Sequence, residues 1–256
     1  MKALELRNIS KSFGGVRAVS DLSFAVEEHE TVGLIGPNGA GKTTVFNLIT
    51  GITRADAGRV EFFGKDVTRM APFHAVRLGM ARTFQNIRLF GSLTVARNVL
   101  VPIIGRIGYG PLAAAFESTR CIEAEKAALD RTMEILDFFH LAARADQPAS
   151  SLPYGEQRRL ELARALAADP KLLLIDEPGA GMNPREIGDL MADIRHVKEA
   201  FGLTILLIEH QMGLVMNLSD RLVVIDFGEK IAEGPPADVR KDRKVIEAYL
   251  GEEFQC

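Results

Sequence analysis

Residues 36–44 read GPNGAGKTT, and this stretch constrains the fold more than any other. It fits the pattern G-x-x-x-x-G-K-[ST], follows an apolar run typical of a buried strand, and opens a helical pattern. Backbone N–H groups, a helix N-terminus and Lys42 can then surround a phosphate, while the Thr43 hydroxyl can bind Mg²⁺. We call residues 36–44 the phosphate loop. Its candidate nucleotide contacts are Gly36, Pro37, Asn38, Gly39, Ala40, Gly41, Lys42, Thr43 and Thr44.

Polar side chains end two further buried strands. KLLLIDEP (171–178) places Asp176 and Glu177 after an apolar run, and TILLIEH (204–210) ends in His210. In parallel α/β sheets, ligands bind at the carboxyl ends of the strands. We therefore expect Asp176 to hold Mg²⁺ through its water shell and Glu177 to polarise the attacking water, with His210 at the γ-phosphate. The alternative is that the carboxylates only cap a turn and that the histidine is structural.

Strands alternate with helices along the chain, which predicts an α/β fold with a parallel sheet. Residues 2–9 and 22–27 alternate apolar and polar side chains like half-buried strands, and the region of about 85–165 is helical. Further helices are expected at 42–50, 74–81, 94–101, 122–139, 154–168, 185–202 (closed by Gly202) and 212–220, a strand and turn at 58–67, and a terminal hairpin at 221–234.

Composition excludes several classes of protein. A net charge of −3 gives no support for broad binding to nucleic acid. The two cysteines, Cys121 and Cys256, are far apart, so no disulfide or metal framework is expected. The apolar stretch Val99–Phe116 contains Arg106, prolines and glycines and is not read as a membrane span. Part of it, Pro102–Phe116, either docks a membrane partner or packs locally.

The order of motifs resembles the nucleotide-binding subunits of ATP-binding cassette (ABC) transporters. The phosphate loop, Gln85, the segment LPYGEQR, LLLIDEP and the final IEH follow one another in that order over nearly the whole chain. The resemblance implies one ABC ATPase domain, residues 1–256. It implies a P-loop NTPase (RecA-like) core with a parallel sheet and an N-terminal antiparallel β subdomain, at about 1–84 and 166–256. An α-helical subdomain is inserted at about 85–165.

The family's functional residues carry over by position. Phe13 matches the aromatic side chain that stacks on adenine, and Gln85 matches the glutamine that reaches Mg²⁺ and faces the transmembrane partner. Glu177 matches the catalytic carboxylate and His210 the switch histidine. GAGMNP (179–184) matches a loop that crosses the dimer interface, with an asparagine where many members carry aspartate.

Residues 152–157 match the signature loop of the family. The resemblance implies that Tyr154, Gly155 and Glu156 bind the γ-phosphate held by the opposite subunit, so that two ATP molecules lie between two chains. A helix N-terminus suits this task because its free N–H groups attract phosphate. Pro153 stands where the family usually has serine and offers neither a hydroxyl nor an N–H. One phosphate contact is therefore in question.

Several segments, among them LPYGEQRRLELARAL, DEPGAGMNP and VIEAYLGEEF, look like the ATP-binding subunits of high-affinity branched-chain amino acid importers. That branch implies ATP and Mg²⁺ as cofactors. It implies two integral-membrane permease subunits, a second homologous ATPase subunit (a heterodimer, with a homodimer left open) and a periplasmic binding protein. The chain would lie at the cytoplasmic face of a bacterial inner membrane, as a peripheral protein with no nucleic-acid partner.

Other functions stay open. Importers of urea and short-chain amides are near relatives of that branch. A soluble ABC ATPase of DNA repair or translation is disfavoured, because it would show long heptad arms, a second cassette or a basic face, and this sequence shows none of them. A nucleotide-binding regulator that docks a protein through Val99–Phe116 is a third alternative.

Overall fold

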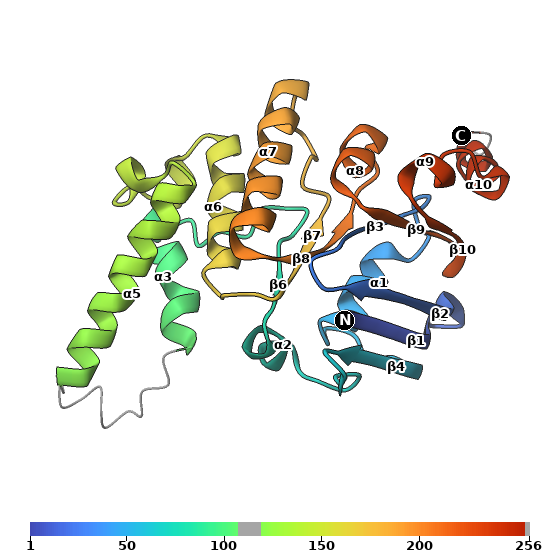
Figure 1. Cartoon of the computed structure of the whole chain (residues 1–256), viewed down its shortest axis with the longest axis horizontal. Coiled ribbons are helices and arrows are strands. Elements are labelled where there is room, and N and C mark those ends of the chain that lie inside the picture. The colour runs from blue at the N-terminus through green and yellow to red at the C-terminus, as the bar shows by residue number, and fades with distance from the viewer. Residues whose placement is uncertain (107–118, 254–256) are drawn as a thin grey trace. The chain divides into compact units, whose positions relative to one another are not determined.

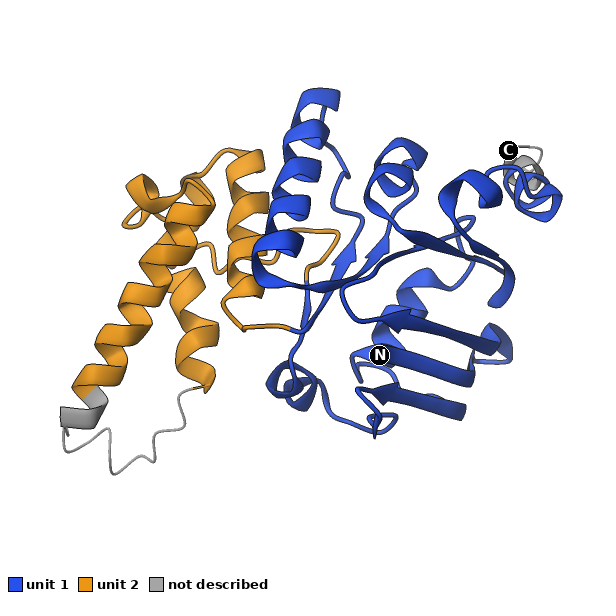
Figure 2. Ribbon diagram, viewed as in Figure 1, with its two compact units in different colours: residues 1–82, 171–256 blue, residues 83–170 orange. Residues whose placement is uncertain are grey.

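The computed structural model describes residues 1–106 and 119–253, which fall into two compact units (Figure 2). Unit 1 comprises residues 1–82 and 171–256, and unit 2 comprises residues 83–170. Unit 1 contains a parallel-rich sheet and an antiparallel sheet, and unit 2 is helical. The predicted fold class is therefore confirmed. Cys256 and residues 107–116 of the predicted docking stretch lie outside the described residues.

The larger sheet of unit 1 has the strand order β10-β9-β3-β8-β7-β6 (Figure 1). Every residue of the strands β3, β7 and β8 is buried, because their continuous apolar runs face helices or sheet on both sides. The strands pair in parallel except β9 with β10. Their bounds are β3 Thr31–Ile35, β6 Met80–Arg82, β7 Leu172–Asp176, β8 Thr204–Ile208, β9 Arg221–Asp226 and β10 Glu229–Gly234.

The second sheet of unit 1 is antiparallel, in the order β2-β1-β4-β5. Over parts of β2, β1 and β4, buried side chains alternate with less buried ones, as expected of a sheet with one face on the core. That face packs in one cluster with buried residues of α1 and of the larger sheet. The strands are β1 Lys2–Phe13, β2 Val16–Glu27, β4 Ala57–Phe62 and β5 Lys65–Asp66.

The helices of unit 1 begin and end where local chemistry requires. α7 starts after Asn183, whose side chain accepts hydrogen bonds from two backbone N–H groups in a capping box, and it ends at the predicted Gly202. The predicted helix at 74–81 is wrong at its end: Gly79 adopts a left-handed conformation and stops α2, and β6 follows. The helices are α1 Lys42–Ile49, α2 Pro72–Leu78, α7 Pro184–Phe201, α8 Met212–Leu218, α9 Pro236–Val239 and α10 Arg243–Glu253.

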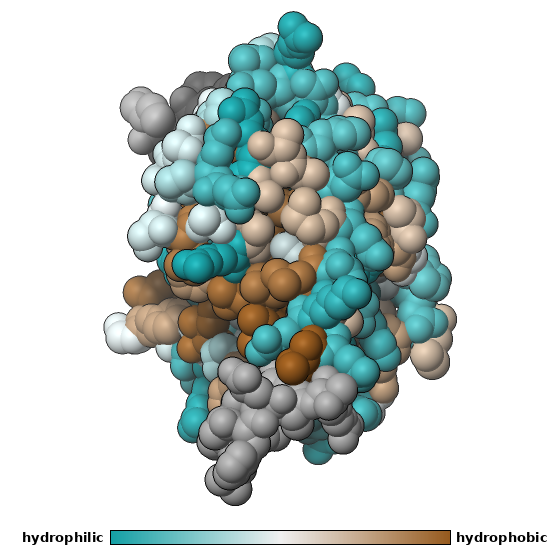
Figure 3. All heavy atoms as spheres, turned by 90° about the vertical axis from the view of Figure 1, so that its left-hand side faces the viewer, coloured by the Kyte–Doolittle hydropathy of each residue, from teal (hydrophilic) through white to brown (hydrophobic). Residues whose placement is uncertain are grey.

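Unit 2 is built from α3 Val95–Arg106, α5 Thr119–Phe138 and α6 Tyr154–Leu166, with two 3₁₀ turns at Ala142–Arg144 and Ala149–Ser151. Within the predicted helix 122–139, which is part of α5, Leu136 is fully buried, whereas Ile122, Leu129 and Met133 are exposed. In the view of Figure 3, apolar side chains gather in one area of the surface that faces the viewer. Within the described residues, no helix combines the length and apolar character needed to cross a bilayer.

Candidate nucleotide site

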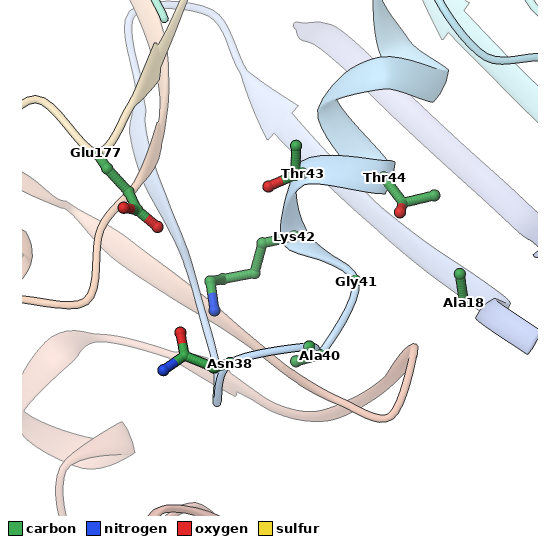
Figure 4. A pocket seen from close by; sticks show the side chains of 9 residues that line it. Ala18, Asn38, Ala40, Gly41, Lys42, Thr43, Thr44 and Glu177 are labelled. Atoms are coloured by element: carbon green, nitrogen blue, oxygen red, sulfur yellow. The ribbon is translucent and has the colours of Figure 1, made fainter. Parts of the chain in front are cut away.

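The phosphate loop lines a pocket of about 230 Å³ in unit 1 (Figure 4). Residues 38–44 form most of its wall, joined by Ala18 of β2 and by Glu177. The side chains of Lys42 and Glu177 point into the same space beside the loop (Figure 4). The structure thus brings the predicted phosphate loop and the predicted catalytic carboxylate together.

Lys42 is folded back over the loop. Its Nζ donates hydrogen bonds to the carbonyl oxygens of Gly36, at 2.6 Å, and Pro37, at 2.7 Å, and the residue is 7% exposed. The ammonium group is therefore already removed from bulk water. Because these two acceptors are neutral carbonyl oxygens of the loop, a phosphate oxygen can replace them as a stronger, charged acceptor.

Two glycines of the loop are required by close backbone approach. Gly41 has φ +101°, and a Cβ at this position would lie 2.4 Å from the carbonyl oxygen of Ala18. Gly36 has φ +152°, and a Cβ there would lie 1.9 Å from the carbonyl oxygen of Ile225. The loop is thus wedged between β2 and β9, and a side chain at either position would displace it.

Asp176 lies at the end of β7 and is 5% exposed. Its Oδ2 accepts a hydrogen bond of 2.7 Å from the guanidinium of Arg82, the last residue of β6. A second nitrogen of Arg82 donates to Oδ1 of Asn47 in α1, also at 2.7 Å. Arg82 was not predicted as a site residue, because nothing in the segment ARTFQN shows that β6 lies next to β7.

Glu177 and His210 lie at neighbouring strand ends. Glu177 has φ +43°, its N–H donates to the carbonyl oxygen of Ile208 at 2.9 Å, and its Oε2 lies 3.7 Å from Nδ1 of His210. A positive φ on a non-glycine residue is a strained conformation that is common at functional sites. The larger part of the Glu177 side chain is buried, whereas half of the His210 side chain is exposed.

Glu209 is a buried carboxylate that the sequence analysis missed. It is 0% exposed, and its oxygens accept hydrogen bonds from the backbone N–H groups of Gly179, at 3.1 Å, and His210, at 2.8 Å. It therefore holds the loop after Glu177 against the loop that carries His210. The signal was present, because Glu209 directly follows the buried strand β8, just as Glu177 directly follows β7.

Phe13 ends β1 and is not among the residues that line the pocket. It is 50% exposed, and the Nζ of Lys11 lies 5.3 Å from the centre of its ring. The exposed ring is available for stacking on a base.

Gln85 belongs to unit 2, and its side chain is exposed. The backbone around it is held by the buried ion pair of Arg158 and Glu161, whose side chains are 3.0 Å apart and 3% and 2% exposed. Arg158 donates to the carbonyl oxygens of Phe84 and Gln85, at 2.8 and 2.5 Å, and Glu161 accepts from the N–H of Phe84 at 3.3 Å. Two residues of α6 therefore fix the segment that carries Gln85.

The signature residues Tyr154, Gly155 and Glu156 form the first turn of α6. Pro153 is the N-cap residue, and no side chain caps the helix there. Tyr154 is 42% exposed, and a Cβ on Gly155 would meet no atom within 4 Å. These three residues lie in the first turn, where backbone N–H groups point out of the helix end and can donate to an anion.

Comparison with known proteins agrees with this arrangement. The family model described as ABC transporter matches residues 19–180, and the model described as branched-chain amino acid ATP-binding cassette transporter matches residues 229–255. The chain belongs to the ABC transporter family. The sequence-based resemblance is confirmed, and the protein is an ATP-binding ABC ATPase.

Named relatives cover nearly the whole chain. The high-affinity branched-chain amino acid transport ATP-binding protein BraF of Pseudomonas aeruginosa is 41% identical over 249 residues, which are 97% of this chain and 98% of BraF. A probable branched-chain amino acid transport ATP-binding protein LivG of Archaeoglobus fulgidus is 38% identical over 259 residues, 100% of this chain and 99% of LivG. The structure of the ADP conformation of MJ1267, an ATP-binding cassette of an ABC transporter, superposes with a TM-score of 0.83 at 37% identity, covering 98% of this chain and 99% of MJ1267.

Proposed function

We propose that this ABC ATPase powers the import of branched-chain amino acids through partner permease subunits. The observation that carries the proposal is the 41% identity to BraF, a protein named for that transport, over 97% of the chain. The match of residues 229–255 to the branched-chain amino acid transporter model supports the same solute. The phosphate pocket with Glu177 at its wall supports hydrolysis of ATP as the energy source.

In this proposal the residues 36–44 hold the phosphates of ATP, and Lys42 exchanges its two carbonyl partners for phosphate oxygens. The site also suits Mg²⁺: Thr43 is exposed and lines the pocket, Asp176 ends β7 in the same sheet as β3, and hydroxyl and carboxylate oxygens are the ligands Mg²⁺ prefers. Thr43, Asp176 and Gln85 are the proposed ligands. When bound, Mg²⁺ neutralises charge on the phosphate oxygens.

Glu177 is the proposed catalytic carboxylate, which orients and polarises the attacking water. His210 contacts the γ-phosphate. The buried Glu209 accepts a hydrogen bond from the backbone N–H of His210, and its Oε2 lies 3.4 Å from Nδ1 of the imidazole, which is also near Glu177. Phe13 stacks on the adenine. We further propose that unit 1 is the nucleotide-binding core and that unit 2 carries the signature loop and, through Gln85, faces the transmembrane partner.

The first turn of α6 supports a two-chain site. The backbone N–H groups of Tyr154, Gly155 and Glu156, in the first turn of α6, would donate to the γ-phosphate of a nucleotide bound by a second, homologous ATPase chain. The assembly then contains this pair of ATPases at the cytoplasmic face of the inner membrane, two integral-membrane permeases and a periplasmic binding protein that delivers the solute.

The test is to purify the chain together with its two permeases and second ATPase in nanodiscs and to measure ATP hydrolysis. Leucine-loaded binding protein should stimulate hydrolysis, and the same protein without solute should stimulate it less. Urea or acetamide should have no effect. Stimulation by urea and not by leucine would overturn the proposed solute, and failure of any membrane protein to copurify would overturn the transport role.

A further inference from the structure

One guanidinium joins two elements of unit 1 that meet at the nucleotide site. Arg82 bonds Oδ2 of Asp176 at the end of β7 and Oδ1 of Asn47 in α1, each at 2.7 Å. The ion pair is buried, with 8% and 7% of the two side chains exposed. The guanidinium also lies over the ring of Phe46, 5.4 Å from its centre. Arg82 is thus held on three sides.

These contacts connect the two candidate Mg²⁺ ligands of unit 1. Asn47 lies four residues after Thr43 in α1, so the two side chains share one face of the helix. Asp176 is the other ligand. Register sets this geometry: Arg82 pairs with Leu174 in parallel, two residues before Asp176 along β7. A side chain as long as arginine reaches from that position to the strand end.

We propose that Arg82 is a positioning residue that fixes the spacing between Asp176 and the helix that carries Thr43, and so sets the affinity for Mg²⁺ in the nucleotide site. The inference rests on the proposed Mg²⁺-dependent ATPase function. Arginine suits the task because its planar guanidinium bonds two acceptors at once and stacks on an aromatic ring, whereas a lysine ammonium is a point charge on a flexible stem.

A purely structural role makes a different prediction. If the ion pair only stabilises the fold, its loss lowers the melting temperature and leaves the Mg²⁺ requirement of the site unchanged. If Arg82 positions Asp176, its loss raises the Mg²⁺ concentration needed at the site, while nucleotide binding without Mg²⁺ through the phosphate loop is retained.

The experiment is a titration of fluorescent ADP, which cannot be hydrolysed further, into the full chain in EDTA and at increasing Mg²⁺. The variants are Arg82→Met, Arg82→Lys and Asn47→Ala. Arg221→Met is the matched control, because Arg221 forms an ion pair with Glu30 at 2.8 Å in the same unit. Circular dichroism and the melting temperature report whether each variant is folded.

We expect all variants to bind ADP within about twofold of the wild type in EDTA. Mg²⁺ should raise the affinity for ADP. The Mg²⁺ concentration that gives half of this increase should be about tenfold higher in Arg82→Met than in the wild type. In Arg82→Lys and Asn47→Ala this Mg²⁺ concentration should lie between those of the wild type and Arg82→Met. In Arg221→Met it should equal that of the wild type.

The outcomes separate the two proposals. If the ADP affinity of the wild type does not change with Mg²⁺, the proposed function is contradicted. A wild type that responds, with the same Mg²⁺ requirement in Arg82→Met, overturns the role of Arg82 alone. If Arg82→Met does not fold, Arg82→Lys and Asn47→Ala decide: an unchanged Mg²⁺ requirement in both would also overturn it.

Discussion

Replacing Pro153 tests how α6 begins, next to the residues that match the signature loop. Pro153 is the N-cap of α6, with φ −56° and ψ 153°, and its carbonyl accepts the N–H of Gln157 at 2.9 Å. A serine can adopt this conformation and offers the hydroxyl that an N-cap uses. Glu156 occupies the third helical position, as in the capping box S-x-x-E.

The magnitude follows from two opposing effects. Removing proline frees the unfolded chain and lowers the free energy of unfolding by about 0.4–1 kcal/mol. A serine N-cap is worth about 0.5–2 kcal/mol relative to alanine. Pro153→Ala should therefore destabilise the protein, while Pro153→Ser should be close to the wild type or slightly more stable. The two variants should differ by about 1 kcal/mol, or roughly 2–4 °C in melting temperature.

Thermal melts of both variants without nucleotide give the answer directly. Equal midpoints for Pro153→Ser and Pro153→Ala would refute the placement of residue 153 at the N-cap. A serine variant that melts well below the alanine variant would refute the reasoning altogether, because only the hydroxyl and its hydrogen bond distinguish the two.

The same substitution tests the proposed contact with phosphate in the assembled ATPase pair. A hydroxyl that bonds the γ-phosphate of the opposite nucleotide contributes about 1.5–3 kcal/mol, or roughly ten- to hundredfold in the ATP concentration needed for closure. We expect a value at the lower end of this range, because the hydroxyl must give up its N-cap hydrogen bond to α6 in order to bind phosphate. Light scattering measures closure against ATP. An unchanged dependence in Pro153→Ser would mean that this loop does not grip phosphate near residue 153.

Three further predictions follow from single contacts. Lys42→Ala should weaken ATP binding roughly ten- to hundredfold by titration calorimetry, because a charged donor to phosphate is lost; unchanged affinity would exclude Lys42 as a phosphate ligand. Arg158→Met should lower the free energy of unfolding by about 3–5 kcal/mol, because Glu161 stays buried without its ion-pair partner. The double variant Arg158→Met with Glu161→Leu should recover part of this loss, as measured by urea denaturation. A double variant no more stable than Arg158→Met would contradict this reasoning. Burial alone would raise the pKa of Asp220, but hydrogen bonds from Lys198 and a backbone N–H outweigh it and hold that pKa below its usual value. Asp220→Asn should therefore destabilise the protein by less than about 1 kcal/mol above pH 4. The difference in stability from the wild type should shrink as the pH falls through the lowered pKa, because the wild type then loses the charge of Asp220. A difference that grows towards acid pH would contradict the lowered pKa.

The parts of the fold that local chemistry determines were predictable. The buried strands β3, β7 and β8 are continuous apolar runs, and α7 carries its own caps. The predicted bounds of β7, β8 and α7 lie within two residues of the observed ones. Short elements were missed or misread, because three or four residues carry no periodicity. β6, which was read as the end of a helix, is the clearest case, although Gly79 marked the boundary.

The site also contains residues that local sequence predicts and residues that it does not. The phosphate loop follows from a local motif, and Glu177 lines the pocket where strand-end reasoning placed it. Arg82 and Glu209 depend on partners far along the chain: Arg82 bonds Asp176, and Glu209 bonds the N–H of Gly179. Sequence spacing does not reveal which strands are neighbours, so contacts across the sheet had to come from the structure.

The measurement that tests the central claim most directly is ATP turnover by the assembled ATPase pair with Glu177 or with Glu177→Gln in this chain. The isosteric substitution keeps the shape of the pocket and removes the carboxylate that polarises water. Binding of ATP with Mg²⁺ should persist, while turnover at this chain's site falls more than tenfold, which corresponds to about 1.4 kcal/mol in the barrier. A smaller fall in turnover, with ATP still bound, would contradict the assignment of Glu177 as the catalytic carboxylate.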